Sequence, residues 1–519
     1  MMVPAFCTVG RRLRPEKSPF CAHRLFGNLL LLSLLLAGFG LLGSQAAWAA
    51  KTVKPKQAVS QARSVVNDTT QWDALGTPDN PGNPGASSQP MPGQPAYLSS
   101  FPAAQWWSDF QDPLLNQLIE TALAQNPTLQ AVETRIQQSQ ALAQVSRSAL
   151  FPQLSVGAGY LWQQYGLNQF VFPLEGRTFH SFQIPLRASY EVDLWGKNRL
   201  ASRASNRGIL SAQLDYHQAV NQLSSLVASS YINLVRLDRL CALQTQLVEN
   251  QNKLLMHTQR LIDYEQASAD SLLPQQQRLQ QTQADLAALE GSRQVAVYQL
   301  RVLLGQSPGQ AALLERSSLL ALLPPQTVPA GIPSDLVVHR PDIMRLENEL
   351  ETAYINIQVA RREFLPAITI NGESGLNAIR IRNLFKWTSL SSFLYPTLSQ
   401  QLFTGGARRG NLKLRKAQYE EMLQRYMEGL LNAFQEVETA LATQQTDSKI
   451  YEQVRQQAEA SQMQSQAERR RYDTGLSSEW QWLNLEVQQL EYQKALAQQH
   501  AQRLIDHISV MKALGGGTR

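Results

Sequence analysis

The sequence predicts a mainly α-helical chain with a smaller membrane β-barrel portion, built from two tandem repeats that each supply a β-hairpin and long coiled-coil helices. Three observations lead to this fold class. Residues 182–194 alternate strictly between apolar and polar side chains, which is the period of a β-strand. Long stretches after that strand carry heptad spacing. The same order of features recurs in the second half of the 519 residues.

The first 49 residues have the layout of a secretory signal peptide. Basic residues precede an apolar run from Leu29 to Gly43, which the small-residue sequence Ala47, Trp48, Ala49 follows. This run is too short to span a bilayer as a helix, so we expect cleavage near Ala49 and no retained anchor. The segment holds five of the 47 basic and one of the 41 acidic residues. The mature chain is therefore almost neutral and gives no reason to expect a nucleic acid partner.

Cysteine usage and composition describe the next segment. Cys7 and Cys21 lie in the signal peptide, so Cys241 remains alone and no internal disulfide is expected. No cysteine follows the apolar run, which argues against a lipid anchor. Residues 50–104 are rich in Pro, Gly and Ser and hold too few apolar residues to fold alone, so we expect a tether or wrapping segment.

The first repeat is predicted over residues 105–305. Two amphipathic helices end at Pro127 and Pro152. A β-hairpin follows at about 152–195, with strands 153–162 and 182–194. Beyond Gly196, buried-type residues recur at alternating spacings of four and three positions. This heptad spacing predicts a helix of nearly seventy residues. A turn at about 264–270 and a return helix ending near Leu304 complete the repeat.

The second repeat is predicted over residues 336–519, after a Pro- and Gly-containing linker at 306–335. Its hairpin is expected at about 366–403 and its long helix at about 406–471. Pro127 and Pro152 are echoed by Pro341 and Pro366 at an offset of 214. After the hairpin, similar residues recur at an offset of 208, so that Tyr264 aligns with Tyr472. Six residues are therefore expected to be missing inside the second hairpin, where loops tolerate length changes.

The hairpins predict a closed membrane sheet that one chain cannot complete. The apolar side chains of 182–194 face one side, and Arg187, Glu191 and Asp193 face the other, which we expect to be the barrel lumen. Four strands cannot close, and hydrocarbon leaves no partner for an open edge, so copies must assemble. Two copies would give eight strands and three would give twelve. The charged inner side chains favour the wider, trimeric barrel, and the helices would continue it as a tube.

The sequence offers little for catalysis. It contains no zinc-ligand spacing, no phosphate loop and no GxSxG motif. We therefore expect no enzyme, no cofactor and no metal site. The rival from another functional class is a secreted periplasmic coiled-coil scaffold or adaptor without a membrane barrel, which explains the heptads but not the two hairpins.

Six motifs resemble the TolC-like outer membrane efflux proteins, particularly the branch that serves resistance-nodulation-division pumps. The resemblance implies a homotrimer with a twelve-stranded outer membrane barrel and a periplasmic α-helical barrel. It also implies a passive duct for small molecules such as drugs, toxic compounds or metals, docked to a periplasmic adaptor (membrane fusion protein) and an inner membrane pump. The matching residues are WWSDFQDPLL at 106–115, QNP at 125–127, YEVDLWGK at 190–197, HRPDI at 339–343, LFTGG at 402–406 and RYDTGLSS at 471–478.

The expected periplasmic tip departs from that family. The family places carboxylates nine and twelve residues after the tip tyrosine of the second half, whereas this chain has Gln481 and Asn484 there, and Leu273 at the first-half equivalent. The first-half turn has Ala267 where Gly475 stands in the second, so the two tips are expected to differ in shape. The residues predicted to form the gate at the tip are Tyr264, Asp270, Tyr472, Gly475, Ser477, Glu479, Gln481 and Asn484.

Overall fold

The computed structural model describes residues 54–61, 105–164, 178–309, 318–319, 322 and 337–516. The predicted signal peptide with its cleavage site, most of the segment 50–104, the tip of the first hairpin and most of the linker 306–335 lie outside the described residues. The described part is mainly helical and contains one antiparallel sheet, as the sequence predicts.

The elements follow the order that the two repeats predict. Each repeat gives a helix of about 22 residues, a set of strands, a helix of 67 residues and a return helix. In chain order the main elements are η3 (Trp106–Phe110), α3 (Pro113–Gln125), α4 (Pro127–Ser148), β1 (Gln153–Val156), β2 (Gly159–Gln164), β3 (Thr178–Val192), α5 (Lys197–Asp263), η4 (Ala269–Ser271), α6 (Leu272–Leu303), α8 (Pro341–Arg362), β4 (Ala367–Ala378), β5 (Leu390–Ser399), α9 (Ala407–Asp473) and α10 (Glu479–Ala513).

Side-chain caps and prolines separate α3 from α4. Asp112 accepts a hydrogen bond from the Leu114 backbone N–H at 2.9 Å, and Asn126 accepts one from the Thr128 N–H at 2.9 Å. A proline occupies the first position of both helices, where its missing N–H costs nothing. The Tyr231 hydroxyl of α5 also donates to the Asp112 carboxylate at 2.6 Å. This bond ties the start of α3 to the long helix.

The sheet has the order β1-β3-β4-β5, and β2 also pairs with β3. The sequence predicted one strand at 153–162, but the structure divides it into β1 and β2, which keep the same register on β3. The break faces Pro185, which has no N–H to donate, so only the bond from the Gly157 N–H to the Pro185 carbonyl remains, at 3.0 Å. β3 begins at Thr178, inside the expected loop, and ends at Val192, two residues before the expected end.

Pro185 also explains a glycine on the other side of β3. Gly375 of β4 lies directly opposite Pro185 in the register. A Cβ atom at this position would lie 2.4 Å from the Ile184 carbonyl oxygen and 2.7 Å from the Pro185 Cα. Both contacts are with backbone, so no side-chain rotation could relieve them. The close approach therefore requires glycine at position 375.

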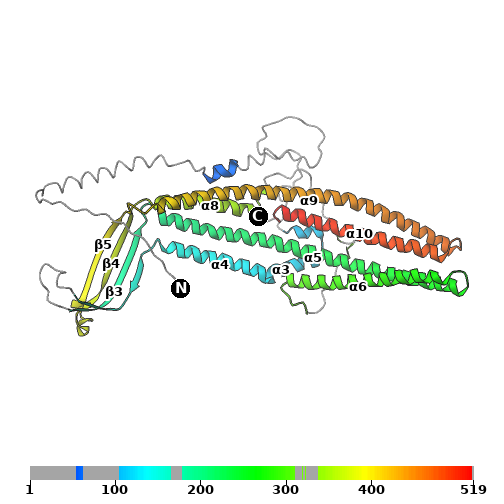
Figure 1. Ribbon diagram of the computed structural model, residues 1–519, viewed down its shortest axis with the longest axis horizontal. Coiled ribbons are helices and arrows are strands. Elements are labelled where there is room, and N and C mark those ends of the chain that lie inside the picture. Colours follow the sequence, from blue (N-terminus) through cyan, green and yellow to red (C-terminus); the bar gives the residue numbers. More distant parts are fainter. Residues whose placement is uncertain are drawn as a thin grey trace, which may run out of the picture. The chain divides into compact units, whose positions relative to one another are not determined.

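The helices pack as a layer in which α5 lies between two rows of shorter helices and α9 lies along one of these rows (Figure 1). Helices α4 and α6 pack along α5, and α8 and α10 pack along both α5 and α9. The shorter helices meet end to end, since the Asn126 side-chain amide donates to the Leu303 carbonyl at 2.8 Å. Likewise the Arg340 guanidinium donates to the Ala513 carbonyl at 2.8 Å. The sequence-based expectation of a broken helix beside a long one is confirmed.

Arg340 of the HRPDI motif holds the second of these junctions together. Its guanidinium is almost fully buried and pairs with Asp342 at 2.8 Å and with Glu436 of α9 at 2.7 Å. Burial alone would lower the pKa of Arg340, but these two carboxylates raise it above its ordinary value. The side chain therefore stays charged while joining the end of α10 to α8 and α9.

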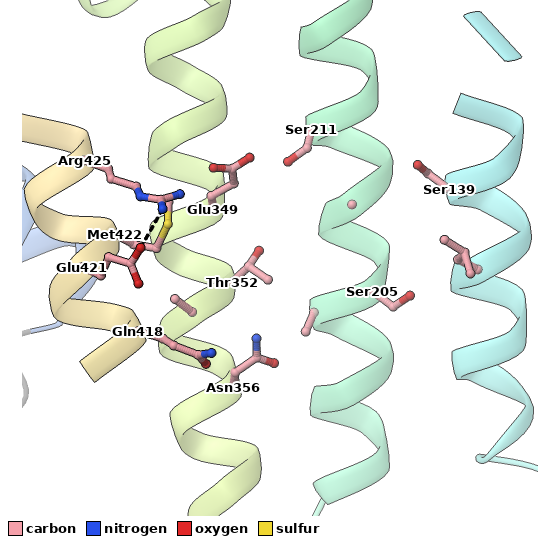
Figure 2. A pocket seen from close by; sticks show the side chains of 14 residues that line it. Ser139, Ser205, Ser211, Glu349, Thr352, Asn356, Gln418, Glu421, Met422 and Arg425 are labelled. Atoms are coloured by element: carbon pink, nitrogen blue, oxygen red, sulfur yellow. Dashed lines mark hydrogen bonds and ion pairs between the residues drawn. The ribbon is translucent and has the colours of Figure 1, made fainter. Parts of the chain in front are cut away.

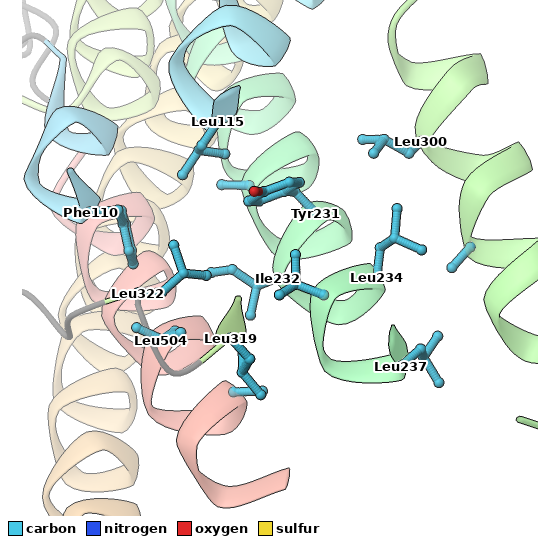
Figure 3. Close-up of a cluster of buried hydrophobic side chains, with 14 of the residues drawn as sticks. Phe110, Leu115, Tyr231, Ile232, Leu234, Leu237, Leu300, Leu319, Leu322 and Leu504 are labelled. Atoms are coloured by element: carbon cyan, nitrogen blue, oxygen red, sulfur yellow. The ribbon is translucent and has the colours of Figure 1, made fainter. Parts of the chain in front are cut away.

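Two hydrophobic clusters lie where these helices meet. The first joins α3, α5, α6 and α10, and Figure 3 shows Leu115, Tyr231 and Leu300 converging within it. The second joins α8, α9 and the end of α10, and it includes Val59 of the short helical segment 55–61. The predicted heptad residues Val227, Leu234, Leu237 and Cys241 are all buried. In the second repeat Leu430, Phe434 and Val437 are buried.

The offset between the repeats after the hairpin is 210, and the predicted value of 208 is wrong. Gly196 and Gly406 both precede a long helix in the left-handed conformation, and Gly305 and Gly515 both follow a return helix in that conformation. Each pair is 210 residues apart. The similar residues Trp195 and Phe403 suggested the offset of 208. The positions with the same backbone conformation are the structurally equivalent ones, and these are 210 residues apart. Four residues, not six, are therefore missing from the second hairpin.

We expect Gly375→Ala to destabilise the sheet by about 1–3 kcal/mol, because the new methyl group overlaps the backbone of Ile184 and Pro185. The thermal midpoint for loss of the β-sheet signal in circular dichroism measures this. The matched control is Gly159→Ala in β2, where a Cβ atom would meet nothing within 4 Å. An equal effect of the two substitutions would contradict the proposed close approach.

Candidate functional site

The predicted tip residues lie in two helical hairpins with the same backbone geometry. In the α9–α10 hairpin Gly475 is left-handed, with a φ of 75°, and the Leu476 N–H donates to the Arg471 carbonyl at 2.8 Å. In the α5–α6 hairpin Glu265 takes the left-handed position, with a φ of 58°, and the Gln266 N–H donates to the Leu261 carbonyl at 2.7 Å. Both hairpins thus end their long helix with the same carbonyl-capping turn.

This geometry corrects two equivalences that the sequence predicted. Glu265, and not Ala267, stands where Gly475 stands in the second half. Tyr264 corresponds to Thr474 and not to Tyr472, because the helix-ending residues are 210 positions apart. A non-glycine residue in the left-handed region is strained. The first tip therefore carries backbone strain at Glu265, whereas glycine at position 475 avoids it in the second. The two turns therefore share one backbone shape, contrary to the expected difference, and differ in which residue takes the left-handed position, Glu265 or Gly475.

A stacked aromatic cluster braces the second tip. The rings of Tyr472 and Trp482 stack with their centroids 5.6 Å apart and an interplanar angle of 15°. The Arg469 guanidinium lies 4.0 Å from the centre of the Trp482 ring, and it also pairs with Asp473 at 3.2 Å. Such contacts hold the end of α9 against the start of α10.

A polar network lies beside this cluster. The Ser477 hydroxyl donates to the Glu468 carboxylate and lies 2.9 Å from the side-chain oxygen of Gln481. The Asn484 amide donates to the Trp480 carbonyl at 2.7 Å. The predicted residues Ser477 and Gln481 are therefore brought together, and Asn484 lies one turn further along the same helix.

The remaining predicted residues reach outward or across to the other hairpin. Glu479 lies 3.8 Å from the Arg260 guanidinium of α5, and this contact links the two hairpins. Tyr264 is 74% exposed and Asp270 is exposed, with its backbone N–H capped by the Ser268 hydroxyl. Leu476 of the second tip is also 74% exposed. Both tips thus present apolar or aromatic side chains to the surroundings.

Four residues that contribute contacts to the tip were not predicted from the sequence, namely Arg260, Glu468, Arg469 and Trp482. A signal existed for one of them, because Arg469 precedes Tyr472 by three residues and therefore lies on the same helix face. Nothing in the sequence indicates the contact between Arg260 and Glu479, which depends on how α5 and α10 pack.

The three predicted lumen residues all engage charged partners. Arg187 pairs with Glu373 of β4 at 2.8 Å, and Glu191 pairs with Lys197 at 2.5 Å. Asp193 lies beyond the end of β3 and accepts hydrogen bonds from the backbone N–H groups of Asn198 and Arg199. Partial burial raises the pKa of Asp193, but these bonds outweigh it and hold the pKa below its usual value. Asp193 therefore serves as the anionic cap of α5.

A polar groove of about 550 Å³ crosses α4, α5, α8 and α9 (Figure 2). Small and polar side chains line it, with Ser139, Ser205 and Asn356 on three of the helices and Glu421 and Arg425 on α9. Glu421 and Arg425 pair at 2.6 Å. The groove lies on the same side of α5 as Lys197, which reaches the polar face of the sheet through Glu191. The polar sides of the sheet and of the helices are thus continuous.

A second groove of about 750 Å³ lies between α9 and α10. All but one of its α9 residues follow those of the first groove at multiples of seven, the exception being Ala440, so both grooves open on one face of α9. Asp506 lines it and is almost fully buried. Burial, reinforced by Asp447 of α9, raises the pKa of Asp506 to about 6. The Asp506 carboxyl therefore holds a proton at mildly acidic pH.

Within the described residues no group of three or more His, Cys, Asp or Glu side chains is placed to hold a metal ion. Among the helices of the described ranges, none combines the length and apolar character needed to cross a bilayer.

Comparison with known proteins finds one family. The sequence profile of the outer membrane efflux protein family matches residues 118–306 and 332–516. The pyoverdine export outer membrane protein OpmQ of Pseudomonas putida KT2440 is 31% identical over 430 residues, which cover 80% of this chain and 89% of that protein. The multidrug resistance outer membrane protein MdtP of Escherichia coli K12 is 26% identical over 437 residues, which cover 81% and 87%.

Solved structures share the fold. The outer-membrane channel OprN superposes with a TM-score of 0.73 at 24% identity, covering 85% of this chain and 99% of that one. The open state of the Neisseria gonorrhoeae MtrE outer membrane channel superposes with a TM-score of 0.70 at 26% identity, covering 78% and 90%.

We expect Trp482→Leu to loosen the second tip by about 1–2 kcal/mol, because it removes both the ring stack and the arginine contact. Amide hydrogen exchange in residues 468–484 should then be roughly tenfold faster, while exchange in the α5–α6 turn stays unchanged. Trp480→Leu is the matched control, since Trp480 is exposed and has no ring partner within the described residues. If both substitutions accelerated exchange equally, the bracing role of Trp482 would be refuted.

Proposed function

This chain belongs to the outer membrane efflux protein family, and from that premise we propose that it forms the passive exit duct of a tripartite efflux system in a Gram-negative outer membrane. The observation that carries the proposal is a sheet with one apolar face and two unpaired edges, joined directly to long helices. The family match favours this function over a periplasmic scaffold without a barrel. We further propose that residues 1–49 are removed on secretion, and that 105–305 and 336–519 form the two efflux repeats.

The register of the sheet supports a membrane-facing surface. Even-numbered residues of every strand share one face, because each pairing joins even to even positions. This face is mainly apolar, whereas the odd-numbered face carries Arg187, Ser189, Asn371 and Glu373. The polar residues of the even-numbered face are Gln164, Thr178, His180, Ser374 and Ser392. β3 has 15 residues, more than the roughly 9–11 that a tilted strand needs to cross a bilayer. The apolar face includes Leu154, Val156, Tyr160, Phe182, Ile184, Leu186, Tyr190, Ile368, Ile370, Leu376, Leu394 and Leu398.

The open edges support assembly of three copies. β1 and β2 form one edge of the sheet and β5 forms the other. All residues of β1 and β5 are exposed. β1 and β2 run antiparallel to β5 within the sheet, so a second copy continues the alternation when its β1 pairs with β5. Counting β1 and β2 as one strand, three copies give twelve strands, a barrel wide enough for an aqueous lumen.

We propose that the continuous polar side of strands and helices is the wall of the duct. The Arg187–Glu373 pair would face the lumen in the membrane, and the grooves along α9 would face it in the periplasm. Because the chain belongs to the outer membrane efflux protein family, the role we propose for this route is the passage of molecules.

Partners and cargo follow from the relatives. They are named for pyoverdine export, multidrug resistance and toluene efflux, so we propose that the cargo of this chain is also small molecules. Energy would come from an inner membrane pump, coupled through a periplasmic adaptor that contacts the exposed residues of the helical tips, such as Tyr264 and Leu476.

Trimer formation can be tested by cross-linking the two open edges. In a Cys241→Ser background, a chain carrying both Val156→Cys and Leu398→Cys, or Leu154→Cys with Leu394→Cys, should form a disulfide ladder that ends at three chains. Single-cysteine variants should give no ladder beyond a dimer. The unboiled protein should migrate at three times the mass of the boiled chain and fractionate with the outer membrane. A soluble oligomer, or a ladder ending at another number, would overturn the proposal.

We also propose that the second tip, with Tyr472, Gly475, Ser477, Glu479, Gln481 and Asn484, helps to close the duct, together with Tyr264 and Asp270 of the first. Tyr472→Ala combined with Gln481→Ala removes the ring stack and the contact with Ser477. The double variant should show a conductance in planar bilayers several-fold above that of the unmodified protein. Gln462→Ala with Met463→Ala, at exposed positions of α9 away from the tip, is the control. A pore that stays closed in the double variant would rule out this gate.

A further inference from the structure

A cluster of basic side chains surrounds the start of both long helices. Arg199 and Arg203 lie in the first three turns of α5, and Arg409, Lys413 and Lys416 lie in the first three turns of α9. All except the half-buried Lys416 are exposed. We call these five residues the basic collar. The ends of β3 and β5 are at most eight residues from the starts of these helices.

Local structure does not account for this charge. The amino-terminal end of a helix carries a partial positive charge and favours acidic residues. Asp193 caps the start of α5, but the first turn of α9 holds no acidic residue. Arg199 pairs with Asp193 at 3.3 Å. For the other four residues, no ion pair is found in the described part of the chain. Glu420 follows Lys416 by one turn on the same helix face, but it too makes no ion pair among the described residues. Apart from Arg199, the collar is thus a concentration of positive charge without an ion-pair partner among the described residues.

The collar lies on the side of the helices that faces away from the polar groove. Arg409, Lys413 and Lys416 are spaced by four and three residues, so they share one face of α9. At 100° per residue this face is roughly opposite to Gln418 and Arg425, which line the groove. The same relation holds on α5 between Arg199 and Gly208. Because Lys197 joins the groove side to the polar face of the sheet, the collar side continues the apolar face.

Exposed apolar and aromatic side chains lie between the collar and the strands. Leu402 and Phe403 precede α9 and are 95% and 90% exposed, and Leu194 and Trp195 precede α5 and are also exposed. Aromatic residues favour the level of lipid headgroups. The order along the chain is therefore apolar strand, aromatic junction and basic helix start. From Arg409 to Lys416 the helix rises by about 10 Å, which is about the Debye length at physiological salt.

We propose that the basic collar binds the anionic headgroups of phospholipids in the leaflet next to the helices. The proposal rests on the membrane barrel described above. An arginine guanidinium can donate two parallel hydrogen bonds to a phosphate group, and lysine adds a mobile charge. Basic residues close to an anionic membrane surface each contribute appreciably to attachment. The collar would fix how deeply the barrel sits in the bilayer.

Reconstitution of the purified full-length protein tests this. The probes are vesicles of phosphatidylcholine alone and vesicles with about 30% phosphatidylglycerol, whose headgroups give the surface a negative potential. The unmodified protein should insert at least about tenfold better into the anionic vesicles, and 1 M salt should reduce this preference. Arg409→Gln with Lys413→Gln and Lys416→Gln should remove most of it.

The matched control removes three exposed basic residues elsewhere, with Arg135→Gln, Arg278→Gln and Lys449→Gln. It should keep the preference of the unmodified protein. Equal preference in the collar variant and in this control would refute the collar. Heat-sensitive migration on gels reports the trimer separately, so a protein that forms no trimer in either vesicle refutes the barrel, whereas an inserted trimer without lipid preference refutes only the collar.

Discussion

Backbone hydrogen bonding at the sheet edges is the constraint on which the rest of the architecture depends. Four strand positions leave two rows of N–H and C=O groups unpaired in a single chain, and hydrocarbon offers them no partner. Neighbouring copies can satisfy them without any new chemistry, because the edge strands already run antiparallel. β1, β3, β4 and β5 each adjoin a helix of the layer at the same end, so closing the sheet in the proposed trimer would also bring the helices of successive copies into one ring.

The helical layer is built from equivalent helices of the two repeats, which together extend over the length of the two 67-residue helices. Each repeat supplies one continuous helix of 67 residues, with α3, α4 and α6 as shorter helices in the first repeat and α8 and α10 in the second. The shorter helices meet at buried junctions, held in one repeat by Asn126 and in the other by Arg340. At both junctions a polar side chain satisfies a carbonyl at a helix end, which would otherwise be buried without a partner. The hydrophobic clusters lie around these junctions, where the packing must be continuous.

Much of this fold could be predicted from the sequence because its signals are local. Heptad spacing found the buried side of α5 and α9, and prolines marked the breaks between helices. The sequence could not predict the division of β1 from β2, because it arises from Pro185 on the opposing strand. β5 looked irregular because Phe393 and Tyr395 lie on its polar side, which disturbs the alternation. At the tip, the Tyr472–Trp482 stack and the contact of Arg260 with Glu479 depend on tertiary packing, and the aligned tyrosines misplaced the repeat by two residues.

The left-handed residue that ends each long helix has a consequence for symmetry. Gly475 adopts this conformation freely, whereas Glu265 is held in it against its preference. In the proposed trimer the ring of six hairpins would therefore alternate between a relaxed and a strained kind. An adaptor that contacts this ring would therefore meet two inequivalent classes of tip, three of each.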